Sequence, residues 1–163
     1  MQVMSDNSDL KFVIGKYGDA VYNVICSRIS RRAEADDIYQ EVFLLYYTKE
    51  LDFPDEAARR SWLIRTALNM TRSANRSSWN IFRDDGELDA ETIPDDVRTP
   101  QEQSLWNAVR GLRDKYRLPV ILHYFNGVPV AEAANMMGIG ENTFKSRLMR
   151  ARKLLKTELE NLL

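Results

Sequence analysis

The chain has 163 residues, of which 44% are hydrophobic and 29% charged, so it can bury a core and is not a disordered polyelectrolyte. One cysteine excludes an intrachain disulfide, and one cysteine with one histidine leaves too few ligands for a zinc site of the Cys/His type. Nucleotide-binding glycine motifs are absent, as is a nucleophile motif beside the histidine, so we expect no enzyme, no catalytic residue, no metal and no cofactor. The N-terminus does not resemble a secretory signal, and no apolar run approaches the ~20 residues that span a bilayer. We therefore expect a cytoplasmic protein without direct membrane insertion.

Apolar residues at helical spacing predict three helices in the first half of the chain, over residues 8–30, 34–49 and about 56–79. In the first, Cys26 lies among apolar residues and is expected to be a small core residue rather than a reactive thiol. Pro54 separates the second helix from the third, because proline lacks a backbone donor and disfavours helix before it.

Residues 83–103 contain two prolines, one glycine and many acids, with few larger apolar side chains. Such a stretch buries little surface, so it predicts a flexible acidic linker. A tether without further function is the simpler interpretation of this segment.

A second helical module is predicted to start near Gln101. Its first helix is marked by Leu105, Trp106, Val109 and Leu112. Pro119 stands where a helix can begin, and Gly127 where it can end. Two short helices follow, separated by Gly138, which can take the left-handed conformation that ends a helix. Because no alternating strand pattern of any length occurs, we expect an all-α fold.

The last helix has two contrasting faces. Phe144, Leu148, Ala151 and Leu155 form an apolar stripe at i, i+4, i+7 and i+11. Ahead of this helix in the sequence, Ala134 is small at the position where two helices must cross, and the side chain of Ile139 is expected to fill the space inside the turn. A basic helix placed second after a glycine turn is typical of a helix-turn-helix that enters the major groove; a solvated basic face is the alternative. The predicted DNA-binding residues are Thr143, Lys145, Ser146, Arg147, Met149, Arg150 and Lys153.

Charge is segregated along the chain although the net charge is only −1. Every charged residue in 57–82 and in 142–157 is basic, whereas acids are concentrated at 34–56 and 84–102. The basic segment of the third helix also carries a tryptophan and so suits strand-separated DNA, whose bases stack on aromatic rings. The residues predicted to contact it are Trp62, Arg65, Asn69, Arg72 and Arg76. A core position for Trp62 and a local hydrogen bond for Asn69 are the alternatives.

Three segments, ADDIYQEVF (35–43), WLIRTALN (62–69) and TFKSRLMRARKLL (143–155), together resemble the signatures of bacterial RNA polymerase sigma factors of the sigma-70 family. The short two-module chain is similar to the extracytoplasmic-function (ECF) group. The resemblance implies a region 2-like domain at 1–82, a linker at 83–103 and a region 4-like domain at 104–163.

The resemblance also implies an alternative sigma factor that binds core RNA polymerase, recognises −10 and −35 promoter elements and helps to melt DNA. It implies that the second helix contacts the β′ clamp helices of the polymerase and that region 4 lies near the β flap. It also implies control by an anti-sigma factor, which can be membrane-anchored. Phe53 and Asn69 match the positions that capture a flipped −10 base, and Lys145, Ser146, Met149 and Arg150 match those that read the −35 element. The implied polymerase-binding residues are Asp36, Asp37, Gln40, Glu41 and Phe43.

Two other classes of protein stay open from the residues alone. One is a dimeric helix-turn-helix transcriptional regulator whose N-terminal module senses a ligand or dimerises. The other is a protein–protein adaptor whose basic faces are merely solvated. Both are disfavoured by the segregated charge and by the tryptophan and arginines of the third helix.

Overall fold

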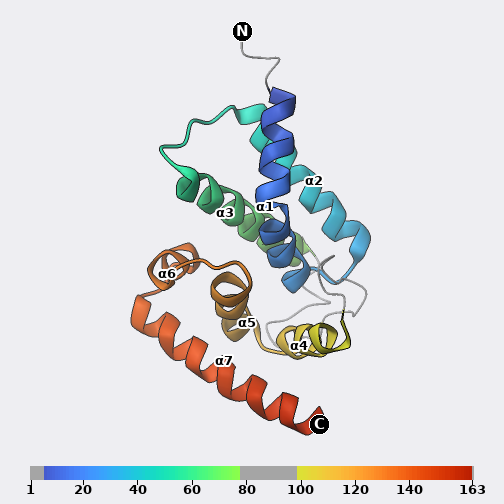
Figure 1. The fold of residues 1–163 in the computed structure, drawn as a ribbon, viewed down its shortest axis with the longest axis vertical. Helices are drawn as coiled ribbons and strands as arrows, with labels where there is room; N and C mark the ends of the chain where they lie inside the picture. Colours follow the sequence, from blue (N-terminus) through green and yellow to red (C-terminus); the bar gives the residue numbers. More distant parts are fainter. Residues whose placement is uncertain (1–5, 78–98, 163) are drawn as a thin grey trace.

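The computed structural model describes residues 6–77 and 99–162, and this part of the chain is helical, without strands (Figure 1). The predicted all-α fold is confirmed. The first module consists of α1 (Asp6–Arg28), α2 (Arg32–Lys49) and α3 (Glu56–Ser77). The second consists of α4 (Pro100–Arg110), α5 (Asp114–Val120), the π-helix η2 (Ile121–Phe125), α6 (Val130–Met137) and α7 (Glu141–Leu162).

The first module packs its three helices against one another around a shared apolar core. Val21 and Ile25 of α1 meet Val42 of α2 and Leu63 and Ile64 of α3, all fully buried. Cys26 is fully buried too, and burial raises the pKa of its thiol to about 12. The prediction that Cys26 is a core residue is therefore confirmed.

The second module begins close to its predicted start near Gln101, inside the last residues of the segment 83–103 that was predicted as linker. α4 starts at Pro100, so the last residues of the segment predicted as linker are helical; most of that segment, 83–98, lies outside the described residues. A capping box causes this start: the Glu102 amide donates to Thr99 Oγ1 at 3.1 Å, and the Thr99 amide donates to Glu102 Oε2 at 2.9 Å. Proline suits the first helical position, where its missing N–H costs nothing.

Pro119 was predicted to begin a helix, and that prediction is wrong. α5 starts at Asp114 and runs through Pro119 into η2. Because Pro119 cannot donate, the helix loses one backbone hydrogen bond and then widens, with the Asn126 amide donating to the Ile121 carbonyl at 2.9 Å. It ends at Gly127, as predicted, in a left-handed conformation with φ +68°.

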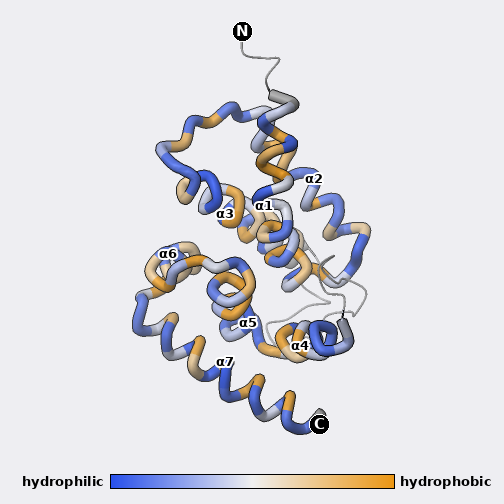
Figure 2. Tube along the Cα trace, viewed as in Figure 1, coloured by the Kyte–Doolittle hydropathy of each residue, from blue (hydrophilic) through white to orange (hydrophobic). Residues whose placement is uncertain are grey.

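The predicted helix-turn-helix is present as α6, a turn at Gly138, and α7. Gly138 has φ +70°, and the Ile139 amide donates to the Ala134 carbonyl at 3.0 Å, which closes the end of α6. The apolar stripe of α7 is buried at Phe144, Leu148, Ala151 and Leu155. Figure 2 shows hydrophobic and hydrophilic stretches alternating along α7. At 22 residues, α7 is far longer than the short helix expected.

The two modules contact each other directly. α1 packs against η2 and α5, so that the second module lies beneath α1 and α3 in Figure 1. Asn126, which follows η2, donates from Nδ2 to the Ala20 carbonyl at 3.0 Å, and Asn23 Nδ2 donates to Asn126 Oδ1 at 3.0 Å. This asparagine therefore anchors the second module to α1.

Candidate nucleic-acid and partner interfaces

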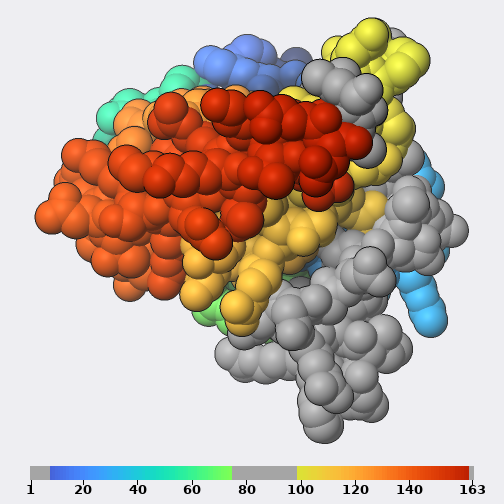
Figure 3. Space-filling model, turned by 90° about the horizontal axis from the view of Figure 1, so that it is seen from below, coloured from blue at the N-terminus to red at the C-terminus, as the bar shows by residue number. Residues whose placement is uncertain are grey.

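The polar face of α7 is open to solvent. Figure 3 shows α7 lying across one face of the molecule without another helix over it. The buried stripe fixes the helix on its own module, which leaves the opposite face free. Exposed along this face are Thr143, Lys145, Ser146, Met149, Arg150 and Lys153. Arg147, the remaining predicted DNA-binding residue, is half-buried and lines a pocket between the modules.

The basic face of α3 is partly covered by α6. Arg60 Nη2 donates to Glu132 Oε1 at 3.1 Å, and Arg65 Nη2 donates to Asn135 Oδ1 at 2.6 Å. Asn69 and Arg72 lie further along α3 and are exposed, whereas the side chain of Arg76 lies outside the described part of the chain. In this arrangement of the modules, the guanidinium groups of Arg60 and Arg65 are therefore engaged by α6.

Phe53 and Trp62 belong to an aromatic cluster beside the start of α3. The Phe53 ring stacks on Tyr46, with centroids 6.4 Å apart, and both rings lie 6.2 Å from Trp62. Trp62 is half-buried against the core, so it has the structural role left open by the sequence as well as a partly accessible edge. Asn69 lies seven residues beyond Trp62, about 10 Å along the helix axis.

The residues predicted to bind polymerase divide into two groups. Asp37, Gln40 and Glu41 are exposed on α2. Asp36 is half-buried and accepts a hydrogen bond from the Tyr22 hydroxyl at 2.8 Å, which together with burial raises the pKa of Tyr22. Phe43 is only 4% exposed and packs on Tyr39, in the core beneath this face.

An apolar groove of about 570 Å³ runs between α1 and α2 beside the exposed polar residues. Its apolar lining residues Leu44 and Tyr47, which are 60% and 41% exposed, were not identified from the sequence. Large apolar residues on the otherwise polar side of α2 were the sequence signal that could have revealed the groove. A mixed face of this kind, with an apolar floor and a charged rim, is typical of a protein–protein interface. Its lining residues are Leu10, Ile14, Asp37, Tyr39, Gln40, Glu41, Phe43, Leu44 and Tyr47.

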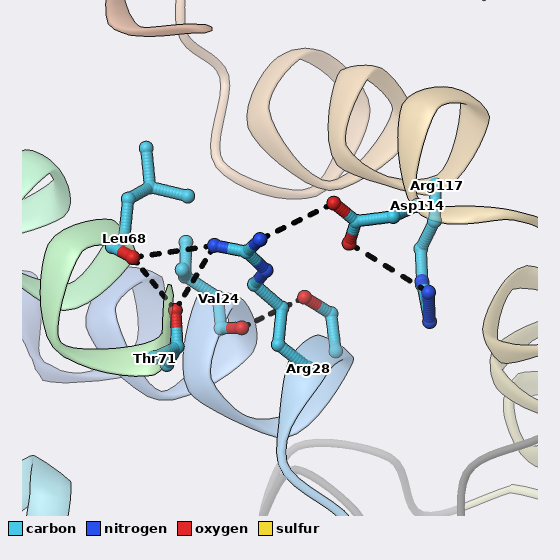
Figure 4. Close-up of polar contacts among 7 residues, drawn as sticks. Val24, Arg28, Leu68, Thr71, Asp114 and Arg117 are labelled. Atoms are coloured by element: carbon cyan, nitrogen blue, oxygen red, sulfur yellow. Dashed lines mark hydrogen bonds and ion pairs between the residues drawn. The ribbon is translucent and has the colours of Figure 1, made fainter. Parts of the chain in front are cut away.

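A buried arginine joins the two modules. Arg28, at the end of α1, donates from Nη1 to the Leu68 carbonyl and to Thr71 Oγ1, both at 3.2 Å (Figure 4). Its Nη2 donates to Asp114 Oδ2 of the second module at 3.2 Å, and Asp114 also pairs with Arg117 at 3.7 Å. No sequence motif marked Arg28, because its partners lie far away along the chain.

The described residues contain no group of His, Cys, Asp and Glu side chains that could hold a metal ion. His123 is fixed locally, since its Nδ1 donates to the Val128 carbonyl at 2.9 Å. Within residues 6–77 and 99–162, none of the helices is both long and apolar enough to cross a bilayer.

Comparisons with known proteins match each of the two modules to a protein family. The family models for Sigma-70 region 2 and for Sigma-70, region 4 match residues 13–81 and 102–155. The chain is 27% identical to the ECF RNA polymerase sigma factor SigW of Bacillus subtilis (strain 168), over 92% of this chain and 88% of the relative. It is 30% identical to the ECF RNA polymerase sigma factor SigL of Mycobacterium tuberculosis (strain ATCC 25618 / H37Rv), over 80% and 77%.

Two solved structures share the fold. One is the sigma factor RpoE in complex with the anti-sigma factor NepR from Bartonella quintana, with a TM-score of 0.73 and 22% identity over 93% of this chain and 97% of that one. The other is CnrH in complex with the cytosolic domain of CnrY, with a TM-score of 0.66 and 20% identity over 98% and 92%. With both family models matched in order and a relative of 30% identity over most of its length, this chain belongs to the ECF RNA polymerase sigma factors.

Proposed function

We propose that this chain associates with core RNA polymerase in the cytoplasm and directs it to promoters whose −35 element is read by α7. The observation that carries the proposal is the uncovered basic face of α7, held by its buried stripe. Lysine and arginine on such a face neutralise phosphates and donate to base edges in the major groove. Synthesis of the phosphodiester bond stays with the polymerase.

The test is transcription in a purified system. The chain is added to its organism's core RNA polymerase with a library of promoter fragments, and the start sites are sequenced. We expect transcripts from a subset that shares −10 and −35 sequences, and none without the chain. Binding of the chain alone to duplex DNA as a dimer, without stimulation of polymerase, would instead identify a conventional helix-turn-helix regulator.

The groove between α1 and α2 is the proposed docking surface for polymerase. We expect Asp37→Arg to weaken polymerase binding about 5- to 100-fold, and Gln40→Ala to weaken it less, because an interface hydrogen bond contributes about 1–3 kcal/mol. Titration of labelled chain with core polymerase measures the effect.

Asp52→Arg is the matched control, since Asp52 is exposed but lies outside the groove. We expect this variant to keep its affinity for polymerase. A loss of helical structure in Asp37→Arg with unchanged polymerase affinity would show that the face serves folding and would contradict the docking assignment.

Asn69 is the proposed reader of a −10 base, because an exposed amide donates and accepts at once. We expect Asn69→Ala to change the preferred base at one −10 position while binding to the −35 duplex is unchanged. Transcription from promoters randomised at −10 gives the base profile, and Asn107→Ala, an exposed asparagine on α4, is the control. An unaltered profile with lower yield would favour a local hydrogen bond of Asn69 within α3.

The arrangement of the modules supports control by a partner. Contacts of Arg60 and Arg65 with α6 cover part of the α3 face that the proposed function needs. The solved relatives RpoE and CnrH are each complexed with a protein, named for RpoE as an anti-sigma factor. We infer that this chain likewise has an anti-sigma factor, which holds the two modules together and hides the polymerase-facing groove. Small-angle scattering should show a more compact chain with that partner than on polymerase.

A further inference from the structure

A pocket of about 260 Å³ lies between the two modules, and its lining comes from both. Its apolar lining residues are Leu68 of α3, Leu118 of α5 and the two methionines that end α6. The other lining residues are charged. They are Arg28 and Arg72 from the first module and Arg113, Asp114, Lys115 and Arg147 from the second.

Basic side chains outnumber acidic ones among the described residues that line the pocket. Of its lining residues, Asp114 alone is acidic, and this carboxylate is already shared between Arg28 at 3.2 Å and Arg117 at 3.7 Å. Among the described residues, none of the cations at positions 72, 113, 115 and 147 forms an ion pair. Within the described part of the chain, positive charge therefore gathers next to apolar side chains, where attraction for an anion is stronger than in bulk water.

Two of the arginines at this site are buried: Arg28 lines the pocket, and Arg117 pairs with the lining residue Asp114. Arg28 and Arg117 are 9% and 4% exposed, although burial of a cation is costly unless it is paired. The pKa of Arg117 is lowered to about 10, chiefly by burial and in part by the neighbouring guanidinium groups of Arg28 and Arg110, against the opposing effect of Asp114. A bound anion would relieve this repulsion.

We propose that this pocket binds a small anion bearing two or more phosphate groups, and that the anion fastens the two modules together. Guanidinium groups suit phosphate because their planar fork donates two parallel hydrogen bonds. The binding groups come from α1 and α3 on one side and from residues 113–115 and α7 on the other, so the complete site exists only while the modules are in contact. Anion binding and module contact must then strengthen each other by the same factor.

Titration calorimetry on the full chain tests whether the pocket binds such an anion, with inorganic pyrophosphate and ATP as separate probes. We expect saturable binding of one anion per chain, weakened about tenfold or more by Arg113→Gln and by Lys115→Gln. Both side chains are exposed at the rim, so their replacement should leave folding intact. Lys156→Gln, an exposed cation on α7 outside the pocket, is the matched control and should bind as the original chain does.

Tighter binding of ATP would identify a nucleotide as the anion, and tighter binding of pyrophosphate an inorganic one. Equal weakening by Lys156→Gln, or the same heat from sodium chloride at matched ionic strength, would reduce the effect to charge screening and overturn the proposal. Scattering provides the second measurement: the radius of gyration should fall when pyrophosphate is added. Saturable binding with an unchanged radius would overturn the claim that the anion fastens the modules.

Discussion

Replacement of Trp106 by alanine is expected to lower the free energy of unfolding of the second module by about 3–5 kcal/mol. Trp106 is fully buried, its ring lies 5.8 Å from Phe125 edge to face, and its helix packs on α7. Loss of the indole leaves a cavity that neighbouring helices fill only partly. Urea denaturation followed by circular dichroism measures the change.

Leu105 provides the matched control, because it is the preceding residue of the same helix and is 38% exposed. We expect Leu105→Ala to cost less than about 1 kcal/mol, as is usual near the surface. Equal losses for the two variants would mean that the indole does not occupy the core of this module.

Loss of Lys145 and Arg150 is expected to have the largest effect on promoter binding. Both are exposed on the uncovered face of α7, about 1.4 turns apart. If either side chain reads a base, its replacement by alanine should reduce discrimination by about 1–3 kcal/mol at one base pair of the −35 element. If it meets only phosphate, affinity should fall evenly across sequences and the salt slope should drop by about one.

Fluorescence anisotropy with a set of −35 duplexes at several salt concentrations separates these two results. Lys156→Ala serves as the control, since Lys156 lies about 9 Å beyond Arg150 along the helix axis. Unchanged binding in both Lys145→Ala and Arg150→Ala would contradict the assignment of α7 as the reading helix.

The helix-turn-helix could be predicted from sequence because its determinants are local. Gly138 ends α6 through its own backbone conformation, and the stripe from Phe144 to Leu155 follows the helix period. The start of α5 could not be predicted in this way. Pro119 is a good first helical residue in isolation, but packing of Leu118, Val120 and Ile121 in the core keeps it inside a longer helix.

The exposed residues of the candidate interfaces were also predictable, because an amphipathic pattern shows which face is polar. The pairing of those residues was not. Arg60 and Glu132 are 72 positions apart, and Arg28 and Asp114 are 86 apart, so only the packing of the modules brings them together. The near-complete burial of Phe43 was not predictable from its motif either, because it depends on how α2 packs on the other helices.

The buried cysteine makes this chain a convenient background for spectroscopic labelling. The thiolate is the reactive form of cysteine, and Cys26 combines full burial with a raised pKa, so maleimide dyes should leave it unmodified in the folded chain. Cysteines introduced at the exposed positions Leu44 on α2 and Met149 on α7 would then react selectively. Energy transfer between two such dyes would follow the opening and closing of the modules in single molecules, with the wild-type cysteine still in place.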